Sequence, residues 1–372
     1  MKSVVAAIPL TERHLDAALA LLHACGLSIA PELFRRHFFE APPCRWPEPD
    51  GPLKGLVLAD GERVVGFLGL VGRELYCRQE VHPVYEMGAL AIAPDYRLYA
   101  PLLTRQLDRR QPALAFYSNT ANPQAVRMFH AAGFEEGCPT NARICFRICD
   151  WRGMLGSVAR RHPRAEKLPV WLIGGFGSLL NMGRPVAQRL PPEQGGAVGR
   201  RLKNVDPDLF CGFWTRLLET NRGLVSSRHP AVLEWLFGED LRGGRALLLA
   251  RFVQERLAGY LVLRRRPLPA PGAFRYMVAD WIAENNDCGI LGDLLRDACR
   301  QASADGAALI ELIGYPGQLQ PLVARYLPRH RPAAANTFIF KVTGRMPAAD
   351  FRREADAGWF WGPFDADRCV VS

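Results

Sequence analysis

The sequence lacks the residue patterns of most metal and disulfide sites. None of its ten cysteines stands in a CxxC pair, and its eight histidines show no HxxxH or HExxH spacing. Zinc sites use such spacings, so no metal is expected. The two cysteines closest in sequence are Cys145 and Cys149, and scattered cysteines of this kind are typical of free thiols in a reducing cytoplasm.

Long hydrophobic runs are also missing. A membrane-spanning helix needs roughly 18 apolar residues, and the nearest stretch, LPVWLIGGFGSLLNM (168–182), is shorter and interrupted by glycines. The first residues, MKSVVAAIPLTERHLD, do not follow the pattern of a secretory signal peptide. We therefore expect a cytoplasmic protein.

Positive charge is concentrated in one segment. The net charge is +10, and residues 151–203 contain ten Lys/Arg and two Glu. Nucleic-acid-binding modules usually interleave basic and aromatic residues on a folded surface, and no such module is found, so nucleic acid is not an expected partner. Basic residues flank the apolar stretch LPVWLIGG within residues 151–190. This segment is either a linker packed between domains or a segment that binds anionic lipid at the inner membrane surface.

The first region, residues 1–150, alternates short strands and helices. Asp60-Gly61 predicts a hairpin turn, because glycine accepts the positive φ that the turn needs. Gly133 predicts a helix end. The patterns predict strands at 4–10, at both sides of the hairpin, and at 84–94, 113–118 and 142–148, and helices at 12–25, 31–39, 98–110 and 123–132.

The second region, residues 205–372, repeats this order after a basic, Pro/Gly-rich linker or insertion at 151–204. ALLLARFVQERLAGYLVLR (246–264) is the counterpart of the first hairpin, with Ala258-Gly259-Tyr260 in place of Val65-Gly66-Phe67. We interpret this as an internal duplication. Strands are expected at 274–283, 307–313 and 336–343, and helices at 206–220, 229–237, 289–304 and 316–326.

Three stretches of the first region resemble the GNAT (N-acetyltransferase) superfamily. They are MGALAIAPDYRLYAPLLTRQL (87–107), NPQAVRMFHAAGFEEG (122–137) and the hairpin carrying Val65-Gly66. The second region resembles a divergent GNAT domain, and the whole resembles tandem-GNAT proteins of polysaccharide biosynthesis clusters. The resemblance implies an α/β fold with a mixed sheet in each of two tandem domains.

The resemblance also implies an acyltransferase that uses acetyl-CoA or another acyl-CoA. Pantetheine would lie along the strand at Leu90, Ala91 and Ile92, and the pyrophosphate on the helix entrance. The usual entrance is Arg/Gln-x-x-Gly-x-Gly/Ala. Here the first glycine is alanine, the middle residue is proline, which has no N–H, and the second glycine is leucine. The residues concerned are Arg97, Leu98, Tyr99, Ala100, Pro101 and Leu102.

Glu86 is the candidate general base, because the resemblance implies an acid near this place. Alternation along a strand would put it on the face of Gly88, Leu90 and Ile92. Partial burial would raise its pKa and suit it to accept a proton from an amine or hydroxyl. The alternative is a solvated glutamate at the strand end.

Two residues of the Asn-to-Gly-Phe motif are candidate coenzyme contacts. Phe129 stands where many GNATs have a proton-donating tyrosine, and a phenyl ring cannot donate. His130 is a weak substitute, because one residue along a helix points roughly 100° away. Asn122 fits a helix cap better than a ligand contact.

The second region has no recognisable phosphate loop. Asp280, Glu284 and Asp287 stand where phosphates would lie and would repel them. The tail acids Asp365 and Asp367, beside Trp359, Phe360 and Trp361, could line a sugar or amine site or simply close the core. Three functions remain: an N- or O-acyltransferase acting on a small-molecule or sugar acceptor, a catalytically silent scaffold, and a Fem-like aminoacyl transferase.

Overall fold

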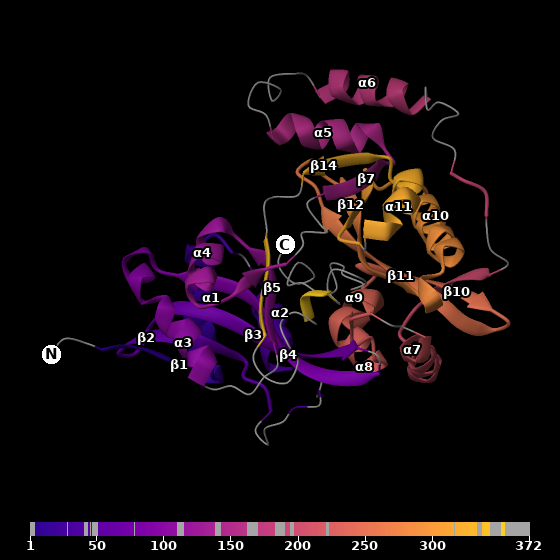
Figure 1. The fold of residues 1–372 in the computed structure, drawn as a ribbon. Coiled ribbons are helices and arrows are strands. Elements are labelled where there is room, and N and C mark those ends of the chain that lie inside the picture. The colour runs from indigo at the N-terminus through magenta and orange to yellow at the C-terminus, as the bar shows by residue number, and fades with distance from the viewer. Residues whose placement is uncertain are drawn as a thin grey trace. The chain divides into compact units, whose positions relative to one another are not determined.

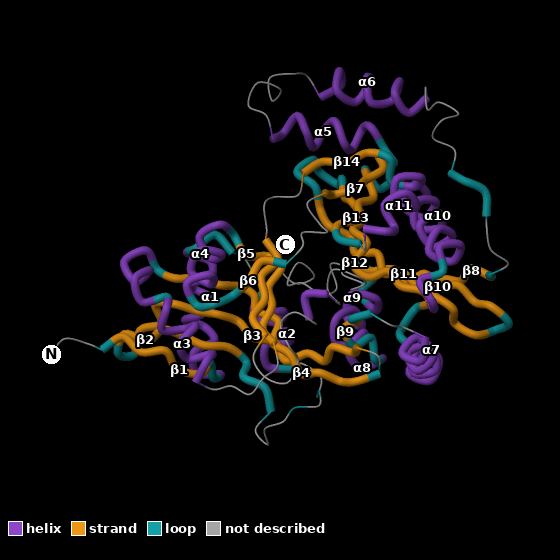
Figure 2. Tube along the Cα trace, viewed as in Figure 1, coloured by secondary structure: helices purple, strands orange, loops and turns teal. Residues whose placement is uncertain are grey.

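The computed structural model describes residues 4–353 except for 28, 41–43, 45, 47–50, 78, 110–114, 138–142, 162–169, 183–189, 194–196, 221–222, 316, 333–336 and 343–350. The chain forms two compact units. The first comprises residues 1–139, 221–236 and 334–372, and the second comprises 140–220 and 237–333. Figures 1 and 2 show a mixed sheet with helices in each. The tail acids and aromatics at 359–367 lie outside the described residues.

The sheet of the first unit has the order β1-β2-β3-β4-β5-β15-β6, with β9 paired to the far end of β3. All pairs are antiparallel except β4 with β5. Its strands are β1 (Val5–Pro9), β2 (Gly55–Asp60), β3 (Arg63–Cys77), β4 (Glu80–Ile92), β5 (Ala115–Ala121), β6 (Glu135–Glu136), β9 (Val225–Ser226) and β15 (Thr337–Val342).

Helices cover both faces of this sheet. On one face, α1 (Leu15–Ala24) and α2 (Pro31–Phe39) pack in a cluster with Phe67, Ala89 and Ala91. On the other face, α3 (Pro101–Arg109) and α4 (Pro123–Ala131) pack with Tyr85 and Met87. The helix α8 (Pro230–Leu233) follows β9 and continues into a π-turn, Glu234–Gly238.

The second unit repeats the strand order as β14-β7-β13-β12-β11-β10-β8. The helices α7 and α10 lie on opposite faces: Phe210 of α7 contacts Tyr260, whereas the neighbouring Gly259 faces Ile290 of α10. The strands are β7 (Arg143–Ile148), β8 (Val198–Leu202), β10 (Ala246–Val253), β11 (Arg256–Pro267), β12 (Phe274–Ala283), β13 (Leu309–Ile313) and β14 (Arg329–Pro332). The helices are α5 (Trp151–Arg161), α6 (Val170–Met182), α7 (Pro207–Thr220), α9 (Glu239–Arg242), α10 (Cys288–Ala304) and α11 (Gln320–Tyr326).

The small-Gly-aromatic step has the same role in both sheets. A Cβ on Gly66 would come within 2.7 Å of Leu58 Cδ1, and one on Gly259 within 2.8 Å of Ile290 Cγ2. Only glycine fits at such distances, so both hairpins depend on it for close packing. The expected mixed α/β fold with two sheets is confirmed.

The two sheets exchange one strand. The sequence order places 142–148 at the end of the first region, but β7 pairs with β13 of the second sheet. Conversely, β15 near the C-terminus pairs with β5 of the first sheet. The two places are equivalent: β15 lies beside β5 in the first sheet, and β7 lies beside β13 in the second. Both strands are short and apolar, so their composition does not reveal which sheet each one joins.

Two other segments differ from expectation. Residues 151–204 were expected as a linker or insertion but contain α5, α6 and β8, and β8 pairs with β10 at the sheet edge. Residues 221–236, expected in the second region, belong to the first unit through β9. Within the described residues no helix is long and apolar enough to cross a bilayer.

Candidate active site

The strands β4 and β5 separate after a short parallel pairing. Only Tyr85 with Phe116 and Glu86 with Tyr117 are in register, although β4 continues to Ile92. Beyond Glu86, no further residue of β4 is in register with a residue of β5 within the described strands. A backbone edge of this kind can pair with an extended amide-containing ligand, as an added strand would.

A β-bulge accompanies this opening. Phe67 pairs with Ala91 and Gly69 with Gly88, so β4 carries one extra residue there. Ala89 has φ of 52°, a left-handed conformation uncommon for a residue other than glycine. Strained backbone of this type costs about 1–3 kcal/mol and is concentrated at functional sites.

The bulge changes which residues share a face. Leu90 and Ile92 pack with Met87 in the cluster of α3 and α4, whereas Ala89 and Ala91 pack with α1 and α2. Glu86 pairs with Val71, which belongs to the α1/α2 cluster. The expectation that Glu86 shares a face with Leu90 and Ile92 is therefore wrong, because it assumed uninterrupted alternation.

Glu86 is buried and paired with an arginine. Its side chain accepts a hydrogen bond from Nε of Arg73 at 2.8 Å, and the two residues are 2% and 7% exposed. The guanidinium also lies 4.9 Å from the ring of Trp235, which in turn stacks on His37. The alternative of a solvated glutamate at the strand end is excluded, because each charge is buried against the other.

Arg73 of this pair also lines a pocket of about 250 Å³, located on β3 between its pairings with β2 and β9. Its polar wall includes Glu74, whose carboxylate accepts a 2.7 Å hydrogen bond from the Tyr76 hydroxyl. Burial, with the Glu74 charge as a smaller cause, raises the pKa of the Cys44 thiol in this wall to about 11. That thiol is therefore protonated at neutral pH and is a poor nucleophile. The lining residues are Cys44, Gly72, Arg73, Glu74, Tyr76, Ser227, His229, Ala231, Val232 and Trp235.

The helix entrance offers few donors to a pyrophosphate. Residues Pro94–Tyr99 form a 3₁₀ turn, in which the N–H of Ala100 donates to the carbonyl of Arg97 at 3.2 Å. Pro101 has no N–H. Leu102 is partly buried in the α3/α4 cluster. Two of the backbone positions that the GNAT resemblance assigns to phosphate binding thus present no unpaired N–H.

The residues of the Asn-to-Gly-Phe motif have internal partners. The Asn122 side chain accepts from the N–H groups of Gln124 and Ala125 at 3.0 and 2.9 Å, so its expected role as a helix cap is confirmed. The Phe129 ring is buried against Phe134. His130 lies 2.7 Å from Glu136, and this hydrogen bond raises the pKa of His130.

The second unit contains an equivalent opening, and the acids near it have internal partners. Its β12 also carries one extra residue, between Val278 and Asp280, and pairs with β13 only over Arg275–Val278. Asp280 accepts a 2.5 Å hydrogen bond from the Tyr260 hydroxyl, and Glu284 accepts one of 2.7 Å from Nε of Arg216. Two of the three acids that were expected to repel phosphate in this unit, Asp280 and Glu284, are therefore hydrogen-bonded within the unit.

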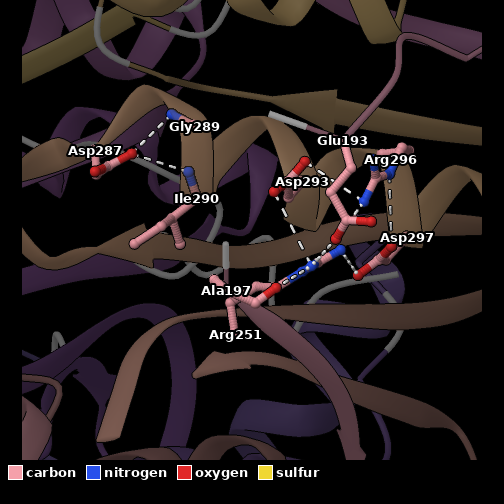
Figure 3. Close-up of polar contacts among 9 residues, drawn as sticks. All are labelled: Glu193, Ala197, Arg251, Asp287, Gly289, Ile290, Asp293, Arg296 and Asp297. Atoms are coloured by element: carbon pink, nitrogen blue, oxygen red, sulfur yellow. Dashed lines mark hydrogen bonds and ion pairs between the residues drawn. The ribbon is translucent and has the colours of Figure 1, made fainter. Parts of the chain in front are cut away.

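The third acid, Asp287, occupies the entrance of α10. Figure 3 shows its carboxylate on the N–H groups of Gly289 and Ile290, at 2.8 and 3.0 Å. Deeper along α10, two buried arginines, Arg251 and Arg296, are held by carboxylates. Their partners are Glu193, Asp293 and Asp297. The N–H groups of Gly289 and Ile290 at the start of α10 are therefore bonded to Asp287, and both arginines are paired with carboxylates.

Comparison with solved structures shows which fold this is. A GCN5-related N-acetyltransferase from Anabaena variabilis matches with a TM-score of 0.58 at 11% identity, over 92% of this chain and 73% of that one. The fold is that of the GCN5-related N-acetyltransferases. A second such protein, from Kribbella flavida, gives 0.56 at 14% identity, over 92% and 71%.

A third matching structure is named as an N-myristoyltransferase and not as an N-acetyltransferase. N-myristoyltransferase from Saccharomyces cerevisiae, solved with bound myristoyl-CoA, gives a TM-score of 0.55 at 14% identity, over 96% of this chain and 90% of that one. No protein-family profile and no curated protein sequence matches the chain. Within the described residues, no three His, Cys, Asp or Glu side chains are grouped to hold a metal ion.

Sequence reasoning did not single out Arg73 or Trp235. Arg73 had a usable signal, because it interrupts the apolar run RVVGFLGLVGRELYC, and a charge in such a strand needs a buried partner. Trp235 had none, since its segment lies far along the chain from α2. The structure brings both to Glu86 but does not bring Asn122 or Phe129 to that side of the sheet.

Arg73→Met should destabilise the protein by about 3–5 kcal/mol, because it leaves the Glu86 carboxylate buried without its counter-charge. Urea unfolding measures this loss. The double variant Arg73→Met/Glu86→Gln should recover most of it, since it removes both charges. If the losses of the two single variants simply add in the double variant, the buried pair does not exist as described.

Proposed function

We propose that the chain is an acyltransferase that takes its acyl group from a pantetheine thioester, of which acetyl-CoA is the form that the resemblance implies. The observation that carries the proposal is the opening of β4 from β5 at Glu86. Leu90, Ala91 and Ile92 follow the bulge along this edge, where pantetheine amides could pair with the backbone. The neighbour with bound myristoyl-CoA supports a thioester donor for this fold.

The acceptor would approach from the α1/α2 face. Its amine or hydroxyl attacks the thioester carbonyl carbon, the new N–C or O–C bond forms, and the C–S bond breaks. Glu86 takes the proton of the nucleophile, directly or through water, and the thiolate leaves. A backbone N–H of β4 would stabilise the oxyanion. With Phe129 buried and unable to donate, the thiolate leaves without help from that residue.

The pocket beside Arg73 is the proposed acceptor site. Tyr76 offers an aromatic ring to sugar C–H surfaces, and Glu74 offers a carboxylate to hydroxyl or ammonium groups. A small-molecule or sugar-type acceptor fits a pocket of about 250 Å³. An acceptor from polysaccharide biosynthesis agrees with this chemistry.

A catalytically silent scaffold protein is the second candidate function, and the altered helix entrance supports it. It explains Pro101 and the buried Phe129 without any ligand. It does not explain why Glu86 and Arg73 are buried together where the strands open. The Fem-like alternative has only the basic segment 151–203 in its favour.

Glu86→Gln should lower the turnover of the folded protein by about 100-fold or more while leaving donor affinity nearly unchanged, because it removes the general base. Because it also removes a charged partner of buried Arg73, turnover is compared at a temperature where the variant is shown to be folded. Transfer of a labelled acetyl group to a panel of amines and amino sugars, followed by mass spectrometry, measures it. Glu80→Gln is the matched control, since Glu80 is exposed on the same strand. Equal turnover of Glu86→Gln and the unaltered protein would remove Glu86 from the mechanism.

We also propose peripheral membrane contact through α5 and α6. These helices lie side by side, with Gly177 of α6 against the backbone of Arg152, and Asn181 bonded to Asp150 (Figure 1). Phe176 and Leu179, one turn apart on α6, are 59% and 64% exposed. The last turn of α5 carries the exposed pair Arg160 and Arg161. Apolar and basic groups together favour an anionic lipid surface.

Phe176→Ser/Leu179→Ser should reduce co-sedimentation with phosphatidylserine-containing vesicles several-fold, because it removes the apolar anchor. Val253→Ser, which alters an exposed apolar residue elsewhere in the same unit, is the control. Vesicles of phosphatidylcholine alone should bind poorly. Equal binding of the double variant and the unaltered protein would contradict the proposed contact.

A further inference from the structure

The surface beside the opened strands is apolar at its centre. Leu98 is 90% exposed, more than any other large apolar side chain in the described part of the chain, and the adjacent Tyr99 is 43% exposed. Both stand on the 3₁₀ turn between β4 and α3, where a bound nucleotide would pass. Two adjacent side chains exposed to this degree are accessible to a partner molecule.

The turn and the two helices that follow it in the sheet's α3/α4 layer carry four exposed arginines. Arg97 on the turn, Arg105 and Arg109 on α3, and Arg127 on α4 are all exposed. These three elements contain two aspartates, Asp95 and Asp108, and Asp108 is held by Lys341 at 2.6 Å. The surface therefore has an excess of positive charge suited to an acidic partner.

The same region suits the pantetheine part of coenzyme A better than its pyrophosphate part. The opening along β4, which would hold the pantetheine arm, is present. The turn that would bind the pyrophosphate has lost donors, since the Ala100 N–H is bonded to Arg97 and Pro101 has none. The misfit is confined to the nucleotide end of the coenzyme.

We propose that the acyl donor is a small acidic carrier protein with the thioester on a phosphopantetheine arm. This rests on the proposed acyltransferase function. The arm enters the β4–β5 opening as pantetheine of coenzyme A would, and a phosphodiester to the carrier replaces the pyrophosphate. Leu98 and Tyr99 form the apolar centre of the docking site. The four arginines form its rim, which speeds association and makes it sensitive to salt.

The chemistry of transfer is unchanged by this donor. The acceptor nucleophile attacks the thioester carbonyl, and the C–S bond breaks. The thiolate remains on the arm, and the proton goes to Glu86. The carrier leaves as its holo form with a free thiol. No oxidant, reductant or metal is needed.

Binding of a fluorescently labelled acyl carrier protein of the fatty-acid-synthesis type tests the proposal without knowledge of the acceptor. Fluorescence anisotropy with the full chain would compare its acetyl-holo, holo and apo forms. We expect micromolar binding of the acetyl-holo form, at least tenfold weaker binding of the apo form, and further weakening as salt rises from low to physiological ionic strength.

Arg105→Glu/Arg109→Glu and Leu98→Ser should each weaken this binding at least tenfold, while thermal unfolding stays unchanged. Arg256→Glu/Arg300→Glu, which reverses two exposed charges of the second unit, is the matched control and should bind normally. In the variant Ala100→Gly/Pro101→Lys/Leu102→Gly, which restores the usual loop, calorimetry should show at least tenfold tighter acetyl-CoA binding than in the unaltered protein.

The outcomes separate this inference from the function on which it rests. Tight acetyl-CoA binding by the unaltered chain without carrier binding would overturn the carrier donor and leave the acyltransferase proposal standing. Carrier binding that is equal for the apo and acetyl-holo forms would also overturn it, because the arm would play no part. Failure of both donors to bind would contradict the acyltransferase function itself.

Discussion

The separation of β4 from β5 is the constraint on which the account depends. The parallel pairing ends after Glu86, and β4 then carries one extra residue, with Ala89 in a left-handed conformation. The same extra residue turns Leu90 and Ile92 to the α3/α4 face and leaves Glu86 on the other. In the proposed reaction, donor and acceptor would therefore approach the reacting carbon from opposite faces of one sheet.

The two units share this strand opening but differ in the side chains around it. In the first unit, Arg73 of the buried pair with Glu86 lines a pocket, and Leu98 is exposed at the helix entrance. In the second, Asp280 and Asp287 take up the equivalent positions with internal hydrogen bonds. The acids near the second opening are thus bound by partners of their own unit, whereas we propose that the first opening receives a ligand.

Local pattern was enough to predict most helices and strands, because capping residues and turns are local. Asp60-Gly61, Asn122 and Gly133 each ended or began an element where expected. The exchange of β7 and β15 was not predictable, since two short apolar strands do not encode which sheet they join. The environment of Glu86 was missed for a related reason: a bulge breaks alternation, and Trp235 reaches α2 only through the fold.

Hydrogen exchange tests the central claim, the ligand-binding opening in the first unit, most directly. Backbone amides of residues 87–92 and of residues 279–283 would be followed by mass spectrometry with and without millimolar acetyl-CoA, which supplies the pantetheine thioester even at weak affinity. The account predicts slower exchange at 87–92 and no change at 279–283. Unchanged exchange at 87–92, or protection only at 279–283, would contradict it.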